Sequence, residues 1–257
     1  MSNPMYPSDL SDEEWALLAP FFQRPDPRGN PGKYAKRAIV NAMLYVTKGG
    51  IQWRMMPTDF PPWDTVYDHF RRLNKRGVWE QALDALNACH RQGQGRTPEP
   101  SYAIIDSQSV KTQYASNERG IDGGKKVKGR KRPIATDILG NLLAVIVHAA
   151  NRADTTEGIR VCMQVVDKYL SIEVFSADAG YRGTTAEWVD EWLNRRVDIS
   201  DKPPQGFEIL PKRWIVERTV ACLGGFRRLA KDFEILTRTA ENMIRIAMIK
   251  VTVAKCV

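Results

Sequence analysis

The order of the apolar segments after residue 100 constrains the fold more strongly than any other feature of this sequence. Three segments rich in apolar and β-branched residues come first, and the Asp, Gly and Asn of "DILGN" (137–141) suit a hairpin turn between the second and the third. Two more strands then alternate with helical apolar stripes, and two helices end the chain. This βββ-α-β-α-β-α-α order allows a crossover connection and predicts a mixed five-stranded sheet of the α/β class, covered by helices.

These elements can be placed by residue number. The predicted strands are 101–110, 132–137, 142–150, 171–178 and 197–200, and the predicted helices are 154–170, 184–196, 212–229 and 239–256. Capping arrangements at Asp154 with Glu157 and at Thr184 with Glu187 are expected to begin the first two of these helices.

Residues 1–92 show only helical patterns. Ser11 and Glu14 have the spacing of a capping box, and glycines at 49, 50 and 77 are placed to end two later helices. Four short helices predict a small all-α domain of the helix-turn-helix kind. Gly, Pro and Gln cluster at 93–100, so we expect a linker there and a separate α/β domain over 101–257.

Two acidic residues come directly after the apolar runs of predicted strands. Asp106 ends "YAII" and Asp178 ends "IEVFSA". Either aspartate alone is more simply interpreted as a turn or helix cap. The strand order permits the first and fourth strands to be neighbours, however, and ligands collect at the carboxyl ends of such strands. Together the two acids indicate a site.

Glu217 is a third candidate acid, on the helix predicted for 212–229. Arg213 lies one turn earlier on the same face, and an exposed Arg/Glu pair is the simpler interpretation. Apolar neighbours suggest instead that this face packs against the sheet, where a carboxylate needs compensation. Three converging carboxylates suit two Mg²⁺ or Mn²⁺ ions, which can catalyse phosphodiester chemistry on a nucleic acid.

A basic run lies between the first two predicted strands. The net charge of the chain is +8, and six cations within "KKVKGRKR" supply most of it. A local block of this kind indicates a polyanion partner, although a solvated linker has the same composition. Its position predicts an exposed loop at the catalytic end of the sheet, gripping a phosphate backbone near the reacting bond. These six cations are Lys125, Lys126, Lys128, Arg130, Lys131 and Arg132.

Composition argues against several other classes of protein. The four cysteines are widely spaced and no histidine lies at metal-ligand spacing, so neither a zinc site nor a disulfide framework is expected. No segment approaches the roughly 18 apolar residues of a membrane span, and no leader pattern is visible at the N-terminus. We therefore expect a cytoplasmic protein with no membrane partner.

Several motifs in order resemble the DDE transposases of bacterial insertion sequences, in the insertion-sequence-five group of the insertion-sequence-four class. They are "AIIDSQSVKT", "GIDGGKKVKGRKR", "TDILGNLLAVIVHAANRAD", "VFSADAGYRG" and "LPKRWIVERTVACLGGFRRLAKDFE". "LSDEEWALLAPFF" and "GIQWRMMPTDFPPWDTVYDHFRRL" resemble the N-terminal helical domain of the same group, so the similarity spans nearly the whole chain.

The resemblance implies an RNase H-like catalytic domain in which Asp106, Asp178 and Glu217 bind two magnesium ions. It implies a DNA endonuclease and strand transferase that binds terminal inverted repeats and target DNA, as a homodimer that holds two ends. The short interval between Asp178 and Glu217 implies that no large domain is inserted there. An inactive or repurposed DNA-binding copy, and an RNase H-like nuclease without strand transfer, remain open alternatives.

The chain departs from the family at two positions of a four-residue signature. Arg213 and Glu217 match, but Leu210 replaces a tyrosine and Gly224 a lysine. Accessory DNA contacts are therefore expected from Arg227 and Arg228 as well as Arg213, and from Tyr181 and Arg182 beside the second acid.

Other residues are candidates for weaker reasons. Three tryptophans of the N-terminal part (53, 63 and 79) and His148 are expected to be structural. Cations of the N-terminal helices are candidates for contacts to the inverted repeats, with an ordinary exposed helical face as the alternative: Lys36, Arg37, Arg71, Arg72, Lys75 and Arg76.

Overall fold

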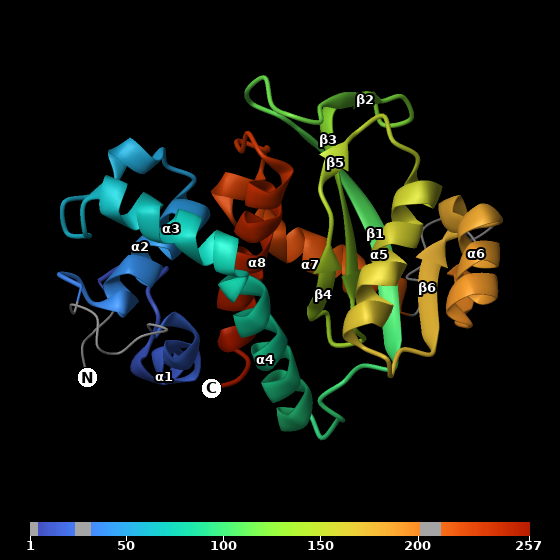
Figure 1. The fold of residues 1–257 in the computed structure, drawn as a ribbon, viewed down its shortest axis with the longest axis horizontal. Helices are drawn as coiled ribbons and strands as arrows, with labels where there is room; N and C mark the ends of the chain where they lie inside the picture. The colour runs from blue at the N-terminus through green and yellow to red at the C-terminus, as the bar shows by residue number, and fades with distance from the viewer. Residues whose placement is uncertain (1–4, 24–31, 201–211) are drawn as a thin grey trace.

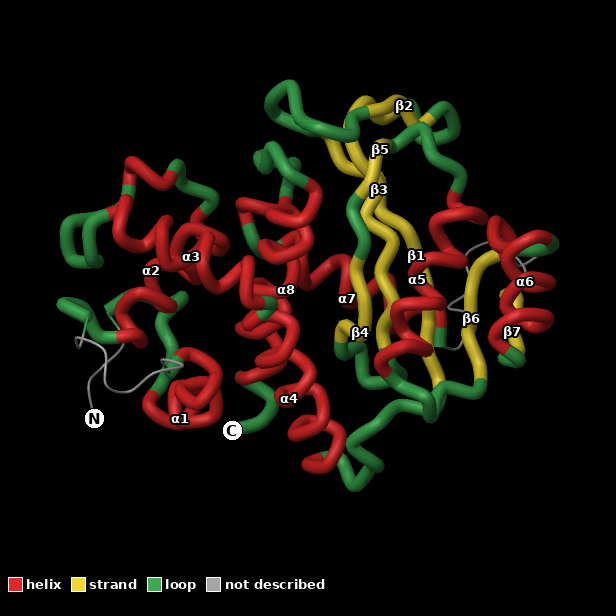
Figure 2. The backbone as a smooth tube through the Cα atoms, in the orientation of Figure 1, coloured by secondary structure: helices red, strands yellow, loops and turns green. Residues whose placement is uncertain are grey.

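The protein combines a curved mixed sheet with helices on both of its faces and a group of helices to one side (Figure 1). The computed structural model describes residues 5–23, 32–200 and 212–257. Within them the sheet has the strand order β2-β3-β1-β6-β7, and two short strands, β4 and β5, also pair with β3 (Figure 2). The β2-β3-β1 pairs are antiparallel, whereas β1-β6 and β6-β7 are parallel. The predicted mixed sheet is therefore confirmed, with seven strands where five were expected.

The strands are β1 Tyr102–Lys111, β2 Gly120–Asp122, β3 Val127–Thr136, β4 Leu142–Val145, β5 His148–Ala149, β6 Val174–Asp178 and β7 Arg196–Ser200. The α-helices are α1 Asp12–Leu18, α2 Lys36–Gly49, α3 Trp63–Arg76, α4 Val78–Gly93, α5 Asp154–Lys168, α6 Thr184–Leu193, α7 Arg213–Gly224 and α8 Thr237–Val253. Short 3₁₀ helices are η1 Ala19–Phe22, η2 Trp53–Met55, η3 Ala179–Tyr181 and η4 Arg227–Leu229.

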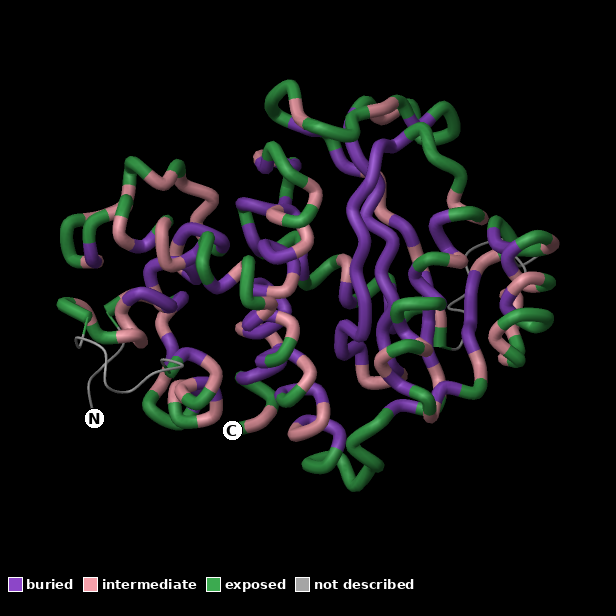
Figure 3. The backbone as a smooth tube through the Cα atoms, viewed as in Figure 1, coloured by how far each residue is buried: buried purple, intermediate pink, exposed green. Residues whose placement is uncertain are grey.

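Alternation along β1 divides the apolar interior into two layers. Ile104 belongs to the cluster that includes α7 and α8, whereas Ala103 and Ile105 belong to the cluster that includes α5 and α6. Successive side chains of a strand point to opposite faces, so one strand serves both layers. Figure 3 shows the central strands buried along most of their length. The backbone that carries Asp106 is therefore held from both sides.

The predicted linker does not divide the apolar core. One continuous cluster contains Trp79 and Leu86 of α4, Met43 of α2 and Ile249 of α8. The N-terminal helices thus surround the last helix, as Figure 1 shows for α4 beside α8. The division into two domains joined by a linker at 93–100 stays a prediction. If residues 1–92 unfolded independently, they would expose this shared core.

Polar contacts also join α4 to the hairpin of "DILGN". Arg91 forms an ion pair of 2.8 Å with Asp137, and both side chains are buried. Asn87 Nδ2 donates to the carbonyl of Leu142 at 2.8 Å. The last turns of α4 are therefore anchored to the sheet before the chain enters β1.

Helix ends follow the sequence signals in the N-terminal part only. Ser11 and Glu14 form the predicted capping box, and Gly50 and Gly77 adopt left-handed conformations after α2 and α3. The two predicted capping arrangements of the α/β part are wrong. Neither α5 nor α6 has a side-chain cap, and α6 follows Gly183, which has no side chain to donate or accept. On α5, Glu157 is buried and accepts from Arg152 and Arg160 instead.

The largest difference from the predicted elements is at β3, which begins at Val127 rather than near residue 132. Gly129 makes this extension possible, because an added Cβ would lie 2.0 Å from the carbonyl oxygen of Val110 on β1. The basic run is consequently strand from Val127 onward. In the described part of the chain, no helix has both the length and the hydrophobicity that crossing a membrane requires.

Candidate active site

The parallel pairing of β1 with β6 brings Asp106 and Asp178 to the same level of the sheet. The register pairs Ile104 with Ser176, and each aspartate lies two residues beyond its strand's member of that pair. Residues two apart on a strand share a face, so both aspartates continue the same row. The adjacency of the first and fourth predicted strands is thus confirmed.

Arg213 connects the second predicted acid to the third. It is the first residue of α7, which packs against β1 and β6. Its Nη2 lies 3.6 Å from Oδ2 of Asp178, and its Nε lies 3.3 Å from Oε1 of Glu217. One guanidinium therefore bridges the end of β6 and the next turn of α7.

Asp106 is the most deeply placed of the three carboxylates. Burial raises the pKa of its carboxyl group, the backbone N–H of Ser107 opposes that change, and the charge of Asp178 raises the pKa further. Lys125 and Arg213 act in the opposite direction. Asp106 and Asp178 are therefore close enough to repel each other, and a cation placed between them would favour the ionised form of both.

Asp178 is held by the turn that follows it. Its Oδ1 accepts from the backbone N–H of Gly180 at 2.9 Å, which makes Asp178 the cap of η3. The simpler interpretation of this residue, a cap, is therefore correct, but Oδ2 remains directed to Arg213. Glu217 is more open, with 55% of its side chain exposed.

The donor set suits a hard cation, but Arg213 stands among the donors. Carboxylate oxygens are what Mg²⁺ and Mn²⁺ prefer. Over residues 5–23, 32–200 and 212–257, however, no three acidic, histidine or cysteine side chains are arranged to hold a metal ion. The acids fit a divalent site in kind, and in this structure the guanidinium of Arg213 contacts both Asp178 and Glu217.

The basic run divides into exposed lysines, at the turn before β3 and at the start of that strand, and buried cations farther along β3. Lys125, Lys126 and Lys128 are exposed, and Lys125 Nζ donates to the carbonyl of Ser107 at 2.9 Å, beside Asp106. The prediction of one exposed loop is wrong for the other half: Arg130, Lys131 and Arg132 lie on β3 and are buried.

Each buried cation of β3 has partners from distant segments. Arg130 Nη1 lies 3.1 Å from Asp232 Oδ2, and Lys131 Nζ lies 3.1 Å from a carboxylate oxygen of Asp154. Arg132 Nη1 donates to the carbonyl of Leu229 at 2.8 Å. These contacts stabilise the fold and leave the three side chains no surface to offer a DNA backbone.

Sequence analysis missed Asp122, which shapes the exposed turn. Its carboxylate accepts from Ser109 Oγ at 2.6 Å and from the backbone N–H groups of Gly124 and Lys125, both at 3.0 Å. The Asp-Gly-Gly sequence at 122–124 is the signal that could have predicted such a turn. Asp122 thereby places Lys125 next to Asp106.

The other residues predicted to contact DNA are also partly buried and partly exposed. Tyr181 is buried, and among the described residues its hydroxyl has no hydrogen-bond partner. Arg228 is buried against Glu234 at 2.8 Å. Arg182 and Arg227 are exposed. The structure therefore corrects the expectation of DNA contact for Tyr181 and Arg228; Leu210 lies outside the described residues.

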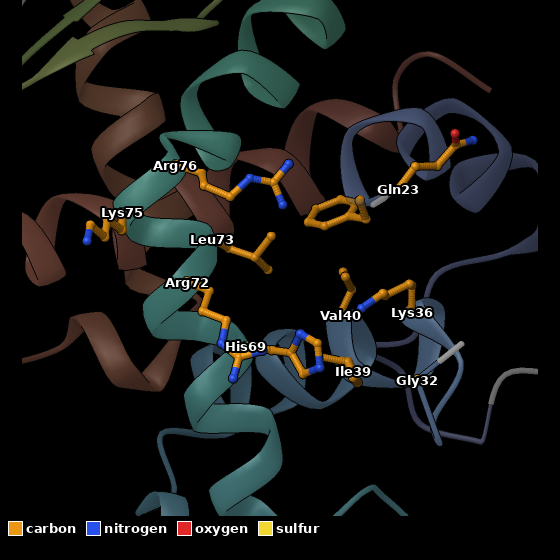
Figure 4. Close-up of a pocket in the computed structure, with 11 residues that line it drawn as sticks. Gln23, Gly32, Lys36, Ile39, Val40, His69, Arg72, Leu73, Lys75 and Arg76 are labelled. Atoms are coloured by element: carbon orange, nitrogen blue, oxygen red, sulfur yellow. The ribbon is translucent and has the colours of Figure 1, made fainter. Parts of the chain in front are cut away.

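The candidate cations of the N-terminal helices border a pocket of about 520 Å³ between α2 and α3. Ile39, Val40 and Leu73 form an apolar floor, and Figure 4 shows Arg76 extending across it. The cations that line it are Lys36, Arg72, Lys75 and Arg76. Arg37 differs, because it pairs with Asp12 at 2.5 Å and with the carbonyl of Leu10.

The expected structural residues are largely internal. Trp79 is buried and donates to Asn74 Oδ1 at 2.7 Å, whereas Trp53 and Trp63 are half-buried. His148 is buried, with Nδ1 2.9 Å from the carbonyl of Ala149.

Comparison with known proteins decides the family. Residues 10–83 match the family model described as "Putative transposase of IS4/5 family", and residues 97–250, more than half of the chain, match the model described as "Transposase DDE domain". The chain belongs to the DDE transposases. A DDE domain implies nuclease and transposase activity, and domains of this family generally use divalent metal ions.

Two curated proteins are similar to about half of this transposase. An insertion element IS402 uncharacterized 16.2 kDa protein of Burkholderia cepacia is 31% identical over 134 residues, which are 50% of this chain and 84% of that protein. The uncharacterized protein y4sN of Sinorhizobium fredii is 26% identical over 121 residues, covering 45% and 87% respectively.

Proposed function

We propose that this transposase cleaves DNA at the ends of an insertion sequence and joins the freed 3′-hydroxyl to target DNA. The observation that carries the proposal is the alignment of Asp106 with Asp178 on neighbouring parallel strands, together with the Arg213 bridge from Asp178 to Glu217. An RNase H-like fold is part of this proposal. The antiparallel β2-β3-β1 strands followed by parallel β6 and β7 support it.

In this proposal Asp106, Asp178 and Glu217 would hold two Mg²⁺ ions, or Mn²⁺ in their place. Bound ions would supply Lewis-acid activation of a water or 3′-hydroxyl and stabilise the leaving oxygen of a phosphodiester. Burial raises the pKa of Asp106, and the Ser107 N–H, Lys125 and Arg213 oppose that shift and favour the ionised carboxylate. The backbone N–H of Gly180 holds Oδ1 of Asp178. Arg213 would release the acids and turn to a phosphate oxygen, which its planar guanidinium suits.

DNA would approach over the exposed lysines of the β2–β3 turn and of the first residues of β3. Lys125, Lys126 and Lys128 are exposed, and Lys125 Nζ donates to the carbonyl of Ser107, the residue after Asp106. Such contacts position a backbone without reading its sequence. We propose that the N-terminal helices bind the terminal inverted repeats and that two copies act as a homodimer, because two ends must be joined in one event.

A cleavage assay tests the proposal. The wild-type protein, with Mg²⁺ and DNA that carries the flanking inverted repeats, should cut at the element ends, and Asp106→Asn should bind but not cut. Asp167→Asn, an exposed acid on α5, is the matched control and should retain activity. Binding without cleavage by the wild type would indicate a DNA-binding copy, and cleavage without joining would indicate a nuclease.

A further inference from the structure

A second basic surface lies where the C-terminal half of α3 meets the beginning of α8. It is a groove of about 350 Å³ lined by α3 on one wall and by Leu236, Arg238 and Thr239 on the other. The residues that α3 contributes are Asp68, Arg71, Arg72, Asn74 and Lys75. Residues more than 160 positions apart in the sequence thus form one surface, which sequence patterns could not reveal.

The charge of this groove is strongly positive. Four cations line it against one acid, Asp68, which already forms an ion pair with Arg72. Within the described part of the chain, neither Arg71 nor Lys75 forms an ion pair through its side chain. Lys75 borders both this groove and the α2–α3 pocket, and Figure 4 shows its side chain extending from α3 away from Val40 and Leu73. The groove therefore carries positive charge that no acidic side chain of its lining compensates.

Arg238 fixes the two walls relative to each other. Its Nη2 donates to the carbonyl of Asn74 at 2.9 Å and approaches that of Lys75 at 3.4 Å, at the C-terminal end of α3. A guanidinium carries five N–H donors, and these contacts use only one of its nitrogens. Arg238 is exposed, so its remaining donors are available to an anion in the groove.

We propose that the α3–α8 groove binds a stretch of DNA phosphate backbone through Arg71, Lys75 and Arg238. The inference rests on the proposed function for its ligand, and it adds a residue of the C-terminal segment to DNA binding. Arg and Lys side chains in a row match the regular phosphates of a nucleic-acid strand. An acidic protein segment is the competing ligand.

The groove would couple end binding to catalysis. The same continuous segment carries Glu217 on α7 and Arg238 on α8, and α8 packs against both α4 and α7. DNA seated on α3 would therefore contact the segment that bears the third acid. The segment from α7 to α8 would therefore connect DNA bound at the N-terminal helices to the candidate active site.

The test measures how salt weakens binding. A labelled random duplex of about 30 base pairs is titrated with full-length protein in EDTA, at several KCl concentrations from about 50 to about 200 mM. Arg71→Gln and Arg238→Gln should each lower the slope of log affinity against log salt by about 0.9, the value for one lost phosphate contact. Arg196→Gln, which removes an exposed cation on β7, should leave the slope unchanged.

The outcomes separate the two proposals. Because EDTA prevents cleavage, binding is measured independently of catalysis. If wild-type protein does not bind DNA, the proposed function fails. If it binds but Arg71→Gln and Arg238→Gln match the wild type, or Arg196→Gln lowers the slope equally, the groove proposal is overturned. Thermal unfolding checks each variant, and should Arg238→Gln unfold through loss of its α3 contacts, Arg71→Gln alone decides.

Discussion

Arg130 and Asp232 form an ion pair of 3.1 Å in which both side chains are completely buried. Arg130 also donates to the carbonyls of Asn117 and Ile235, so a single side chain joins the β1–β2 loop to the segment before α8. Asp232 continues this junction, because its backbone N–H donates to Lys111 at 2.8 Å. A residue of the basic run is thus a structural centre of the α/β part.

Breaking this pair should strongly destabilise the protein. Arg130→Met leaves Asp232 buried without its charge partner, which typically costs about 3–5 kcal/mol of the free energy of unfolding. Arg196→Gln breaks the exposed pair with Asp198 and should cost about 1 kcal/mol or less. Urea denaturation measures both. Equal, small effects would show that Arg130 is not a structural residue.

The exposed half of the run should behave in the opposite way. Replacing Lys125, Lys126 and Lys128 with Gln should reduce the salt slope of DNA binding by about 2–3, since each lost phosphate contact contributes about 0.9. The melting temperature should hardly change, because all three side chains are exposed. Anisotropy titrations and thermal unfolding give the two values. An unaltered slope would show that these lysines do not contact DNA and belong to a solvated linker.

His148 should make stability depend on pH. Burial lowers the pKa of its imidazole, so the unfolded chain takes up a proton before the folded one as pH falls. The stability that neutral His148 contributes is therefore complete above its unfolded pKa of about 6.5 and is lost as pH falls toward the folded value. The melting temperature should drop between about pH 7.5 and 5.5.

The variant that isolates this effect is His148→Gln. It should flatten the dependence of the melting temperature on pH, whatever its effect on absolute stability. If the melting temperature of His148→Gln depended on pH as strongly as that of the wild type, another group would be responsible for the dependence.

Arg213 should compete with divalent cations for the acids. Arg213→Gln removes the positive charge from Asp178 and Glu217 and should tighten Mn²⁺ binding several-fold while slowing cleavage. Arg218→Gln, one turn later and stacked on Trp214, is the matched control and should bind Mn²⁺ as the wild type does. Weaker Mn²⁺ binding by Arg213→Gln would mean that the guanidinium supports the metal site.

Much of the fold could be predicted because local signals and tertiary structure agree. The capping box at Ser11, the left-handed glycines at 50 and 77 and the "DILGN" hairpin all form as expected. The adjacency of Asp106 and Asp178 also followed, because strand order limits which strands can be neighbours.

The errors arise where distant partners decide the outcome. The sequence around Arg130 looks like a charged loop, and only Asp232, about a hundred residues later, makes its burial possible. Glu157 has helix-capping spacing, yet Arg152 and Arg160 bind its carboxylate. Arg238 carried no signal at all, because its relation to α3 exists only in three dimensions.

The most direct test of the account asks whether Asp106, Asp178 and Glu217 act as one catalytic unit. Single-turnover cleavage of end DNA is measured for Asp106→Asn, Asp178→Asn, Glu217→Gln and the three double variants. Residues that act as a unit are non-additive, so every single variant should fall to the same residual rate and no double variant should fall further. Glu191→Gln, exposed on α6, should cleave as the wild type does. Substantial cleavage by any of the three single variants, or losses that multiply in the doubles, would contradict the account.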